Sequence, residues 1–226
     1  MAKFNVNSNA YIIIYSVVMV VVVAVLLAVT SLSLQERQQA NMLNEKQQQI
    51  VKALGENPET SSYGDVVAQA VMLDKNGKAI EGKSESDIFA SLSDLTASFE
   101  AGEFPIFKAK NGCVVIPVYG AGLWGPIWGY VSLNDDKATV YGAYFAHAGE
   151  TPGLGADIAL PKFQNQFPGK KISREGEFTS IAIVKPGKTD DTKDYVNGIS
   201  GGTITSQGVD AMLLEGLGQY VNFLKQ

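Results

Sequence analysis

Residues 104–119 read FPIFKAKNGCVVIPVY, and this stretch decides the fold. Two apolar runs, Phe104 to Lys110 and Cys113 to Tyr119, flank the dipeptide Asn111-Gly112. An Asn-Gly pair between two such runs is a strong local signal for a β-hairpin, because both residues tolerate positive φ. We therefore predict two antiparallel strands here, joined by a tight turn.

The sequence that follows repeats this arrangement. Ile127 to Leu133 and Ala138 to Phe145 flank the Asn-Asp-Asp run at 134–136, which predicts a second hairpin. Another strand is expected over Phe178 to Val184, ended by Pro186-Gly187. The sheet should therefore be largely antiparallel.

Two helices are expected beside this sheet. Ala156 to Phe167 has a helical pattern, and Pro161 is expected to break or kink it. Ser206 is the expected N-cap of a C-terminal helix. The apolar residues at helical spacing are Ile158, Phe163 and Phe167 in the first helix and Val209, Met212, Leu213, Leu217, Tyr220 and Leu224 in the second. The predicted fold class is α+β, a largely antiparallel, twisted sheet flanked by helices.

An uncharged segment precedes this domain. Ile12 to Val29 is almost wholly apolar, and at about 1.5 Å per residue a helix over Ala10–Leu34 can cross a hydrocarbon core of about 30 Å. A cleaved signal peptide is the alternative, but its apolar core is shorter and follows a clearly basic start, whereas only Lys3 is charged here. We therefore predict a retained membrane anchor over residues 1–34.

A helix should continue out of the anchor. Residues 35–55 are rich in helix formers and carry only a thin apolar stripe, which predicts a juxtamembrane helix partly packed against a partner or its own domain. Gly55 to Gly64 should be a linker, and residues 56–226 the soluble domain. A chain beginning near Leu54 is expected to fold, since the predicted strand and helix faces all lie beyond that point.

Composition excludes several classes of function. The net charge is −5 and no basic stripe occurs, so a nucleic-acid partner is not expected. Cys113 and His147 are the only residues of their kinds, which rules out an internal disulfide and a four-cysteine metal site. Cys113 is expected to be a buried strand thiol. Redox chemistry would need a bound organic cofactor.

A glycine- and hydroxyl-rich segment stands before the C-terminal helix. Residues 198–206 read GISGGTITS, where paired glycines allow close approach of a ligand and a helix N-terminus favours negative charge. The segment is a reasonable phosphate site but not a P-loop, which would end in Gly-Lys-Ser/Thr. The alternative is a turn that merely caps the helix.

Two more segments suit a flat ligand. Residues 150–155, ETPGLG, form a tight turn with little side-chain cover, and His147 just before it is a candidate ligand or proton donor. Residues 120–129, GAGLWGPIWG, place Trp124 and Trp128 among glycines. The alternatives are an ordinary loop for the first and a hairpin with core tryptophans for the second.

Taken together, these segments resemble the FMN-binding domain of the C-subunit of the sodium-translocating NADH:quinone oxidoreductase, to which the G-subunit of the Rnf complex is related. In that family a flavin transferase uses FAD to esterify FMN, through its phosphate, to the threonine of a Ser-Gly-Ala-Thr motif. The resemblance implies covalent FMN on Thr203, with Gly202 replacing the alanine and Asn197 replacing an acidic residue. The other residues implied at the cofactor site are Ser200, Gly201, Gly202, Thr205, Leu123, Trp124, Glu150, Thr151, Gly153 and Leu154.

The resemblance also implies a function. The chain would be a single-pass component of a respiratory complex in the bacterial cytoplasmic membrane, with its FMN domain on the periplasmic side, passing electrons toward quinone. No Rossmann fingerprint is present, so NADH is expected to bind another subunit. The alternatives are the Rnf-type G-subunit and a membrane-anchored flavin-binding module without electron transfer. A secreted hydrolase is more remote, because no nucleophile elbow or carboxylate pair is evident.

Overall fold

A computed structural model of the chain describes residues 8–226, which divide into one unit that ends at Glu45 and another that runs from Lys46 to Gln226. The long helix α1 (Asn9–Ala53) forms the first unit from Asn9 onward and the start of the second. The predicted boundary between an anchor over 1–34 and a juxtamembrane helix over 35–55 falls inside this helix and stays a prediction. Lys3, used in the anchor argument, lies outside the described residues.

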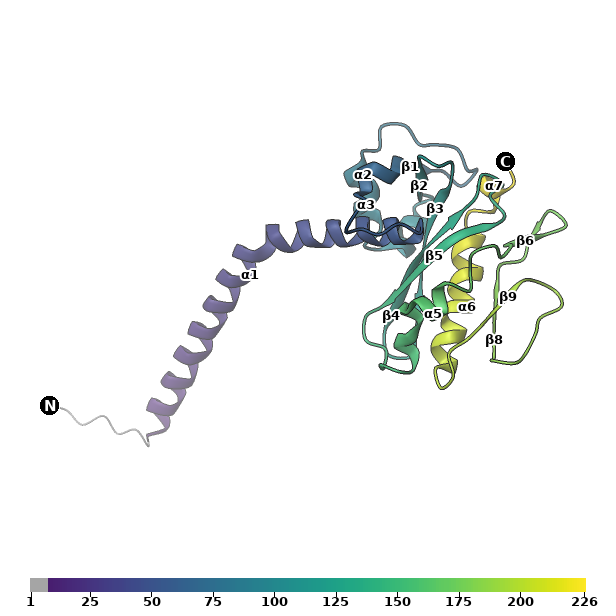
Figure 1. The fold of residues 1–226 in the computed structure, drawn as a ribbon. Coiled ribbons are helices and arrows are strands. Elements are labelled where there is room, and N and C mark those ends of the chain that lie inside the picture. The colour runs from purple at the N-terminus through teal and green to yellow at the C-terminus, as the bar shows by residue number, and fades with distance from the viewer. Residues whose placement is uncertain (1–7) are drawn as a thin grey trace. The chain divides into compact units, whose positions relative to one another are not determined.

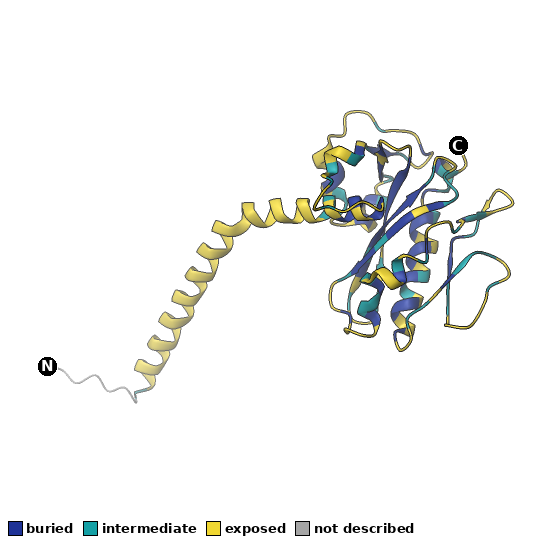
Figure 2. Ribbon diagram, viewed as in Figure 1, coloured by how far each residue is buried: buried dark blue, intermediate teal, exposed yellow. Residues whose placement is uncertain are grey.

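The N-terminal part of α1 has the length and composition of a membrane span. Its best 18-residue window has a mean hydropathy of 3.2, and none of that window is buried. The large apolar side chains from Tyr11 to Leu34 are exposed, as the yellow part of the helix shows (Figure 2). Such a surface is suited to lipid, where the helix satisfies its own backbone hydrogen bonds. Within residues 8–226, no other helix is long and apolar enough to cross a membrane.

The second unit is built on a five-stranded antiparallel sheet (Figure 1). Neighbouring strands are also consecutive in sequence, so the sheet is a simple meander. Its strands are β1 (Val67–Leu73), β2 (Phe104–Ala109), β3 (Val114–Ala121), β4 (Pro126–Leu133) and β5 (Val140–His147). With helices packed beside it, the sheet confirms the predicted α+β class.

Both predicted hairpins are present, and the first has a three-residue loop. Ala109 and Cys113 close it through the Ala109 N–H and the Cys113 carbonyl, 2.8 Å apart. Gly112 has φ of 89°, whereas Asn111 is not among the residues with positive φ. The Asn111 side-chain oxygen instead accepts a hydrogen bond from the Cys113 N–H at 3.1 Å. The pair therefore works as a turn ending in a left-handed glycine, as in hairpins with three-residue loops.

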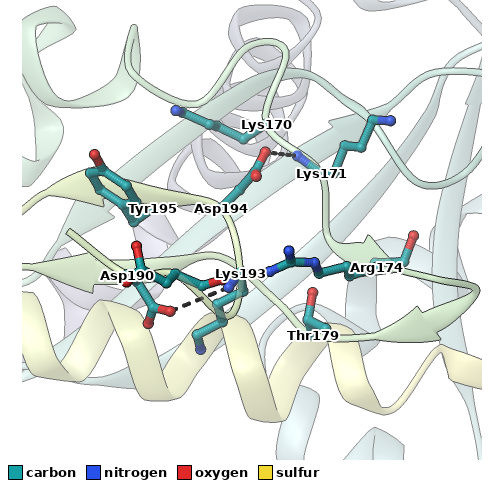
Figure 3. A pocket seen from close by; sticks show the side chains of 10 residues that line it. Lys170, Lys171, Arg174, Thr179, Asp190, Lys193, Asp194 and Tyr195 are labelled. Carbon is teal, nitrogen blue, oxygen red and sulfur yellow. Dashed lines mark hydrogen bonds between the residues drawn. The ribbon is translucent and has the colours of Figure 1, made fainter.

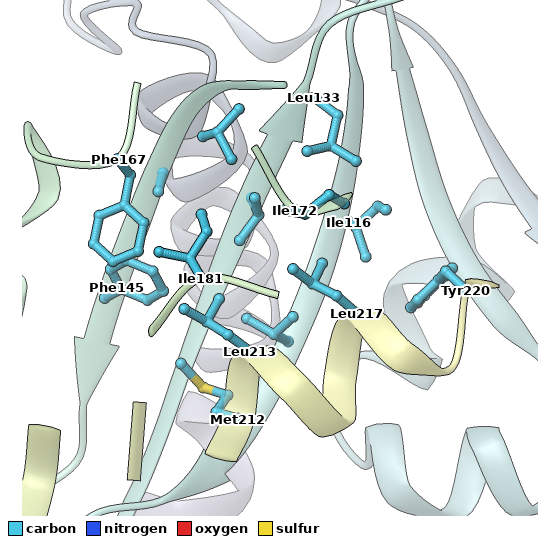
Figure 4. Close-up of a cluster of buried hydrophobic side chains, with 14 of the residues drawn as sticks. Ile116, Leu133, Phe145, Phe167, Ile172, Ile181, Met212, Leu213, Leu217 and Tyr220 are labelled. Atoms are coloured by element: carbon cyan, nitrogen blue, oxygen red, sulfur yellow. The ribbon is translucent and has the colours of Figure 1, made fainter. Parts of the chain in front are cut away.

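Each face of the sheet is buried against different elements. Because side chains alternate along a strand, Ile116 and Val118 point into one core while Val115 points into the other. The first core lies under α6 (Thr203–Gly218) (Figure 4) and the second under the end of α1 and α3 (Glu85–Ser91). Strands buried on both faces read as continuous apolar runs, which explains the CVVIPV sequence.

The end of α1 belongs to the second core. Ile50, Val51 and Ala53 are at most 1% exposed, so the expectation that the core begins after residue 54 is wrong. Ser132 on β4 donates a hydrogen bond to the Ala53 carbonyl at 2.5 Å. Lys46 donates to the Phe89 carbonyl at 3.1 Å, near the end of α3. The C-terminal part of the apolar stripe is thus buried in the chain's own domain, whereas Met42 is 55% exposed.

The predicted helix over 156–167 is broken where Pro161 stands. A 3₁₀ helix, η1 (Gly155–Ala159), ends before it, and α5 (Pro161–Gln164) begins with the proline at its first position. Proline has no N–H to donate and suits that position. Ile158, Phe163 and Phe167 are buried, as predicted.

The predicted strand over 178–184 is wrong as one element. It is divided into β7 (Glu177–Phe178), paired with β6 (Ser173–Arg174), and β8 (Ala182–Val184), which runs parallel to β9 (Tyr195–Asn197). Between them Ser180 has φ of 61°, and its N–H and that of Thr179 both donate to the Ile172 carbonyl. This left-handed residue redirects the chain.

The remaining helices are short. They are α2 (Tyr63–Val66), α4 (Leu95–Glu100) and α7 (Val221–Leu224). Strand β1 and helices α3 and α4 were not predicted, although Ser84 and Asp94 each cap the helix that follows them.

Candidate functional site

Three loops separated in the sequence meet around one carboxylate, Glu150. Its Oε1 accepts a hydrogen bond from the Trp124 N–H at 2.8 Å, and its Oε2 accepts one from the Thr205 hydroxyl at 2.5 Å. Glu150 therefore joins the loop between β3 and β4, the loop after β5 and the first turn of α6. These are the three segments that the sequence singled out.

Glu150 is held in its charged form. Its side chain is 5% exposed, and burial alone would raise its pKa. The hydrogen bonds from the Thr205 hydroxyl and from the amides of Trp124 and Leu123, with the nearby His147, outweigh burial and bring the pKa of Glu150 below its ordinary value. A buried carboxylate with two good donors rigidly positions the groups that donate to it.

The glycines at this junction are required by close packing. A Cβ on Gly155 would overlap both Glu150 Oε2 and Thr205 Oγ1. A Cβ on Gly122 would stand 2.5 Å from Glu150 Oε1. Any larger residue at either position would displace the carboxylate.

Two tight turns face each other beside this junction. In Thr151–Leu154 the Leu154 N–H donates to the Thr151 carbonyl at 3.1 Å, and Gly153 has φ of 75°. In 199–202 the Gly202 N–H donates to the Ile199 carbonyl at 3.0 Å, and Gly201 has φ of 78°. Both turns place glycine at the third position, where positive φ is needed.

The turns touch through Leu154 and Gly201. A Cβ on Gly201 would lie 2.6 Å from Leu154 Cδ2. The loop after β5 and the loop before α6 therefore form one surface, with a leucine side chain lying on bare glycine.

The four hydroxyls of residues 200–206 fall into two pairs. Thr205 and Ser206 are buried, and each is engaged: Thr205 with Glu150, and Ser206 as acceptor from the Ile199 N–H at 2.9 Å. Ser200 and Thr203 are exposed. The prediction that Ser206 is the N-cap of α6 is therefore wrong. The N-cap is Gly202, which has no side chain to cap the helix. The exposed Thr203 is the first residue of α6, and no side chain accepts a capping hydrogen bond from the amides of its first turn.

Large apolar side chains surround this helix start without being buried. Trp124 is 70% exposed, and Leu123, Leu154 and Ile204 are 42–54% exposed. Clustered apolar exposure of this kind marks a binding surface. Trp128 is different, since it packs against the second core and donates its indole N–H to Gln49 at 3.0 Å. The alternative that tryptophans fill the core thus holds for Trp128 only.

His147 has a structural partner. Its Nδ1 accepts a hydrogen bond from the Glu150 N–H at 3.2 Å, which fixes the turn leading to Glu150. In the described residues, 8–226, no group of three or more His, Cys, Asp or Glu side chains could hold a metal ion. Cys113 is buried, as predicted, and burial raises its pKa.

Two surface depressions lie on this side of the sheet's C-terminal elements. One, of about 410 Å³, is lined by Thr203 and Ser200 and by Lys185 on the segment after β8. The other, of about 370 Å³, lies among the charged residues of 170–195 (Figure 3). There Asp194 accepts from the Lys171 N–H at 2.8 Å and Asp190 from the Lys193 N–H at 3.2 Å, so these carboxylates brace loops. Of the two, only the first is lined by Ser200 and Thr203, and neither is lined by Glu150, Trp124 or Thr205.

Sequence reasoning missed several contributors to the junction. Gly155 was noted only as part of a turn, yet it contacts both Glu150 and Thr205. Asp157 accepts a hydrogen bond from the Gly153 N–H at 3.0 Å. An aspartate four residues after the turn glycine could have been predicted to accept a hydrogen bond from the turn backbone.

Comparison with known proteins agrees with this geometry. Residues 122–218 match the family model described as FMN-binding domain. The chain is 30% identical to the C-subunit of the Na(+)-translocating NADH-quinone reductase of Haemophilus ducreyi, covering 93% of this chain and 90% of that protein. It is 29% identical to the protein of the same name from Vibrio campbellii, covering 82% of each.

A solved structure is also similar. The crystal structure of the Na(+)-translocating NADH-quinone reductase C-subunit from Parabacteroides distasonis has 44% sequence identity and a TM-score of 0.79, covering 85% of this chain and 98% of that one. The chain belongs to the C-subunit family of the Na(+)-translocating NADH-quinone reductase, and it contains an FMN-binding domain.

Proposed function

We propose that this chain carries FMN covalently, through a phosphoester to the Thr203 hydroxyl, and transfers electrons within the reductase. The observation that carries the proposal is the contrast between two threonines of one helical turn. Thr205 is buried and bound to Glu150, whereas Thr203 is exposed at the helix start. Only the second has a hydroxyl open to an incoming group.

The residues around Thr203 fit a flavin phosphate. The first turn of α6 has amides without a capping side chain, and the positive end of the helix dipole favours a phosphate there. Attachment would replace AMP on the phosphorus of FAD by the Thr203 oxygen, with release of the hydroxyl proton. A dedicated flavin transferase would act as the partner for this step.

The exposed apolar side chains fit the ring system. Trp124, Leu123 and Leu154 stand on the two loops that Glu150 and Gly201 hold against α6. We propose that they cover one side of the isoalloxazine and exclude water from it. Thr151, Gly153, Ser200 and Gly202 would line the rest of the site. When bound, FMN supplies the redox chemistry, since the chain offers none of its own.

The wider role follows from the relatives' names. They are subunits of an NADH-quinone reductase, so we propose that NADH reacts on another subunit and that this chain relays electrons toward quinone. The apolar part of α1 would hold the chain in the bacterial cytoplasmic membrane. We place the FMN domain on the periplasmic side, in the orientation implied by the sequence resemblance.

The test is flavin fluorescence in a denaturing gel, with the flavin transferase co-expressed. Thr203→Ala should abolish the fluorescent band and leave the fold intact, because one exposed hydroxyl contributes little to stability. Thr205→Ala should keep the band, since that hydroxyl only orients Glu150. A band that survives Thr203→Ala and disappears in Thr205→Ala would shift the attachment point by two residues. A wild-type chain without a band would refute covalent attachment.

A further inference from the structure

The depression beside Thr203 is lined by one charged side chain, Lys185, to which no role has been assigned above. Its lining comes from two segments: residues 183–186, which end β8, and residues 198–207, which lead into α6. Lys185 is the only ionisable residue among them. Thr203 lines the same depression, so the two side chains share one cavity of about 410 Å³.

Lys185 has no counterion in the described part of the chain. The ion pairs found there are Lys83–Glu103 and Lys225–Glu177. Two carboxylates of this part of the domain already accept hydrogen bonds. Asp210 accepts from the Ile183 N–H at 2.7 Å, and Glu150 is bound to Thr205 and Trp124.

This arrangement places two positive groups together. The first turn of α6 has the positive end of the helix dipole, and Lys185 adds a full charge in the same cavity. An anion bound in this depression would be attracted by both groups. Lysine is a compact point charge that suits a phosphate oxygen.

We infer that Lys185 is the positioning residue for the flavin phosphate: its ammonium pairs with the phosphate that Thr203 carries. The inference rests on the proposed function. A phosphodiester retains one negative charge, which Lys185 neutralises from the β8 side while the α6 amides bind from the other.

Lys185 and Lys188 make a matched pair for testing this. Both are exposed and lie in one turn, where the Lys188 N–H donates to the Lys185 carbonyl at 2.9 Å, but only Lys185 lines the depression. The first experiment labels surface amines with an acetylating reagent in the full chain, flavinylated or carrying Thr203→Val, and reads each lysine by mass spectrometry. Pairing of the Lys185 ammonium with a phosphate oxygen should slow its acetylation several-fold on flavinylation.

Lys188 should react at the same rate in both proteins. Equal rates for Lys185 in both, with the flavin confirmed on Thr203 by mass, would overturn the inference and leave the proposed function standing. A wild-type chain without flavin on Thr203 would contradict both the inference and the proposed function.

The second experiment measures the initial rate of flavin incorporation by intact mass, with transferase and FAD limiting. Lys185→Gln should incorporate flavin about tenfold more slowly, the change expected for about 1.4 kcal/mol. Lys185→Arg should restore most of the rate, and Lys188→Gln should leave it unchanged. Equal rates for Lys185→Gln and wild type would contradict a role for Lys185 in placing the phosphate.

Discussion

The two faces of the five-stranded sheet are covered by different elements and in different ways. Under α6, Glu150 and the glycines beside it bring three loops together at one end, while Tyr220 donates to the Pro105 carbonyl elsewhere on that face. Under the end of α1 and α3 the polar contacts, such as Gln49–Trp128 and Ser132–Ala53, only tie a helix to the sheet. The difference shows that one face forms the scaffold and the other builds the site.

Removal of the end of α1 from the scaffold face should lower the free energy of unfolding more than any other change considered below. A soluble chain beginning at Leu54 lacks Ile50 and Val51, which are 0% and 1% exposed. Because burial of each stabilises the fold by about 1.5–3 kcal/mol, the free energy of unfolding should fall by about 3–6 kcal/mol. Urea denaturation should show a midpoint far below that of a longer chain, since this loss is a large share of the about 5–15 kcal/mol that stabilises a domain.

A chain beginning at Lys46 is the control for that loss. It keeps the buried turns of α1 and should unfold in one cooperative transition. Equal stability of the two chains would show that the end of α1 is not part of the core.

The next largest effect is expected at the site face, from Glu150→Ala. This change leaves the Trp124 amide and the Thr205 hydroxyl without their acceptor, at a cost of about 1–3 kcal/mol each when water does not replace it. The free energy of unfolding should fall by about 2–6 kcal/mol, and flavin incorporation should fall with it.

Glu150→Gln is the matched control. A glutamine amide can accept from Trp124 and donate to Thr205, so the loss should stay within about 1 kcal/mol. If both variants were equally destabilised, the charge rather than the hydrogen bonds of Glu150 would hold the loops.

A smaller effect should follow when the polar contact on the scaffold face is removed. Gln49→Leu deprives the Trp128 indole of its acceptor at 3.0 Å, but Trp128 is only partly buried and water can reach it. We expect a loss of about 1 kcal/mol and no change in flavin incorporation. A double-mutant cycle with Trp128→Phe should give a coupling energy of similar size.

Trp128 lies four residues after Trp124 on the same hairpin. A fall in flavin incorporation in Gln49→Leu would therefore mean that the scaffold face acts on the site through this hairpin, which would contradict the division between scaffold and site.

The smallest effect should be the pH dependence due to Glu150. Its pKa in the fold lies below the ordinary value of 4.5, so its charged form stabilises the fold at neutral pH. That contribution is lost as the pH falls through the folded pKa, below about 4.5. Wild type should therefore lose more stability than Glu150→Gln between pH 7 and pH 3, by urea titration at each pH. Parallel curves would show that other carboxylates dominate acid unfolding.

Local sequence determined the elements whose signals are local. Asn111-Gly112 specified a hairpin, Pro161 ended a helix, and the run from Ile12 to Val29 predicted a membrane span. Each depends on backbone conformation or composition over a few residues, which a sequence states directly. The three glycine-rich segments were found in the same way, because glycine is needed where backbone and ligand approach closely.

Only the tertiary structure decided which residues share an environment. Thr203 and Thr205 look alike in the sequence, but Glu150, 55 residues before Thr205, buries one and leaves the other exposed. Lys185 lines the depression at Thr203 because β8 pairs with β9, the strand that leads into the α6 loop. Residues 178–184 have the composition of a single strand, yet Ser180 turns the chain into two sheets. These outcomes depend on contacts between distant segments, whose free energy exceeds the weak local preference of any one of them.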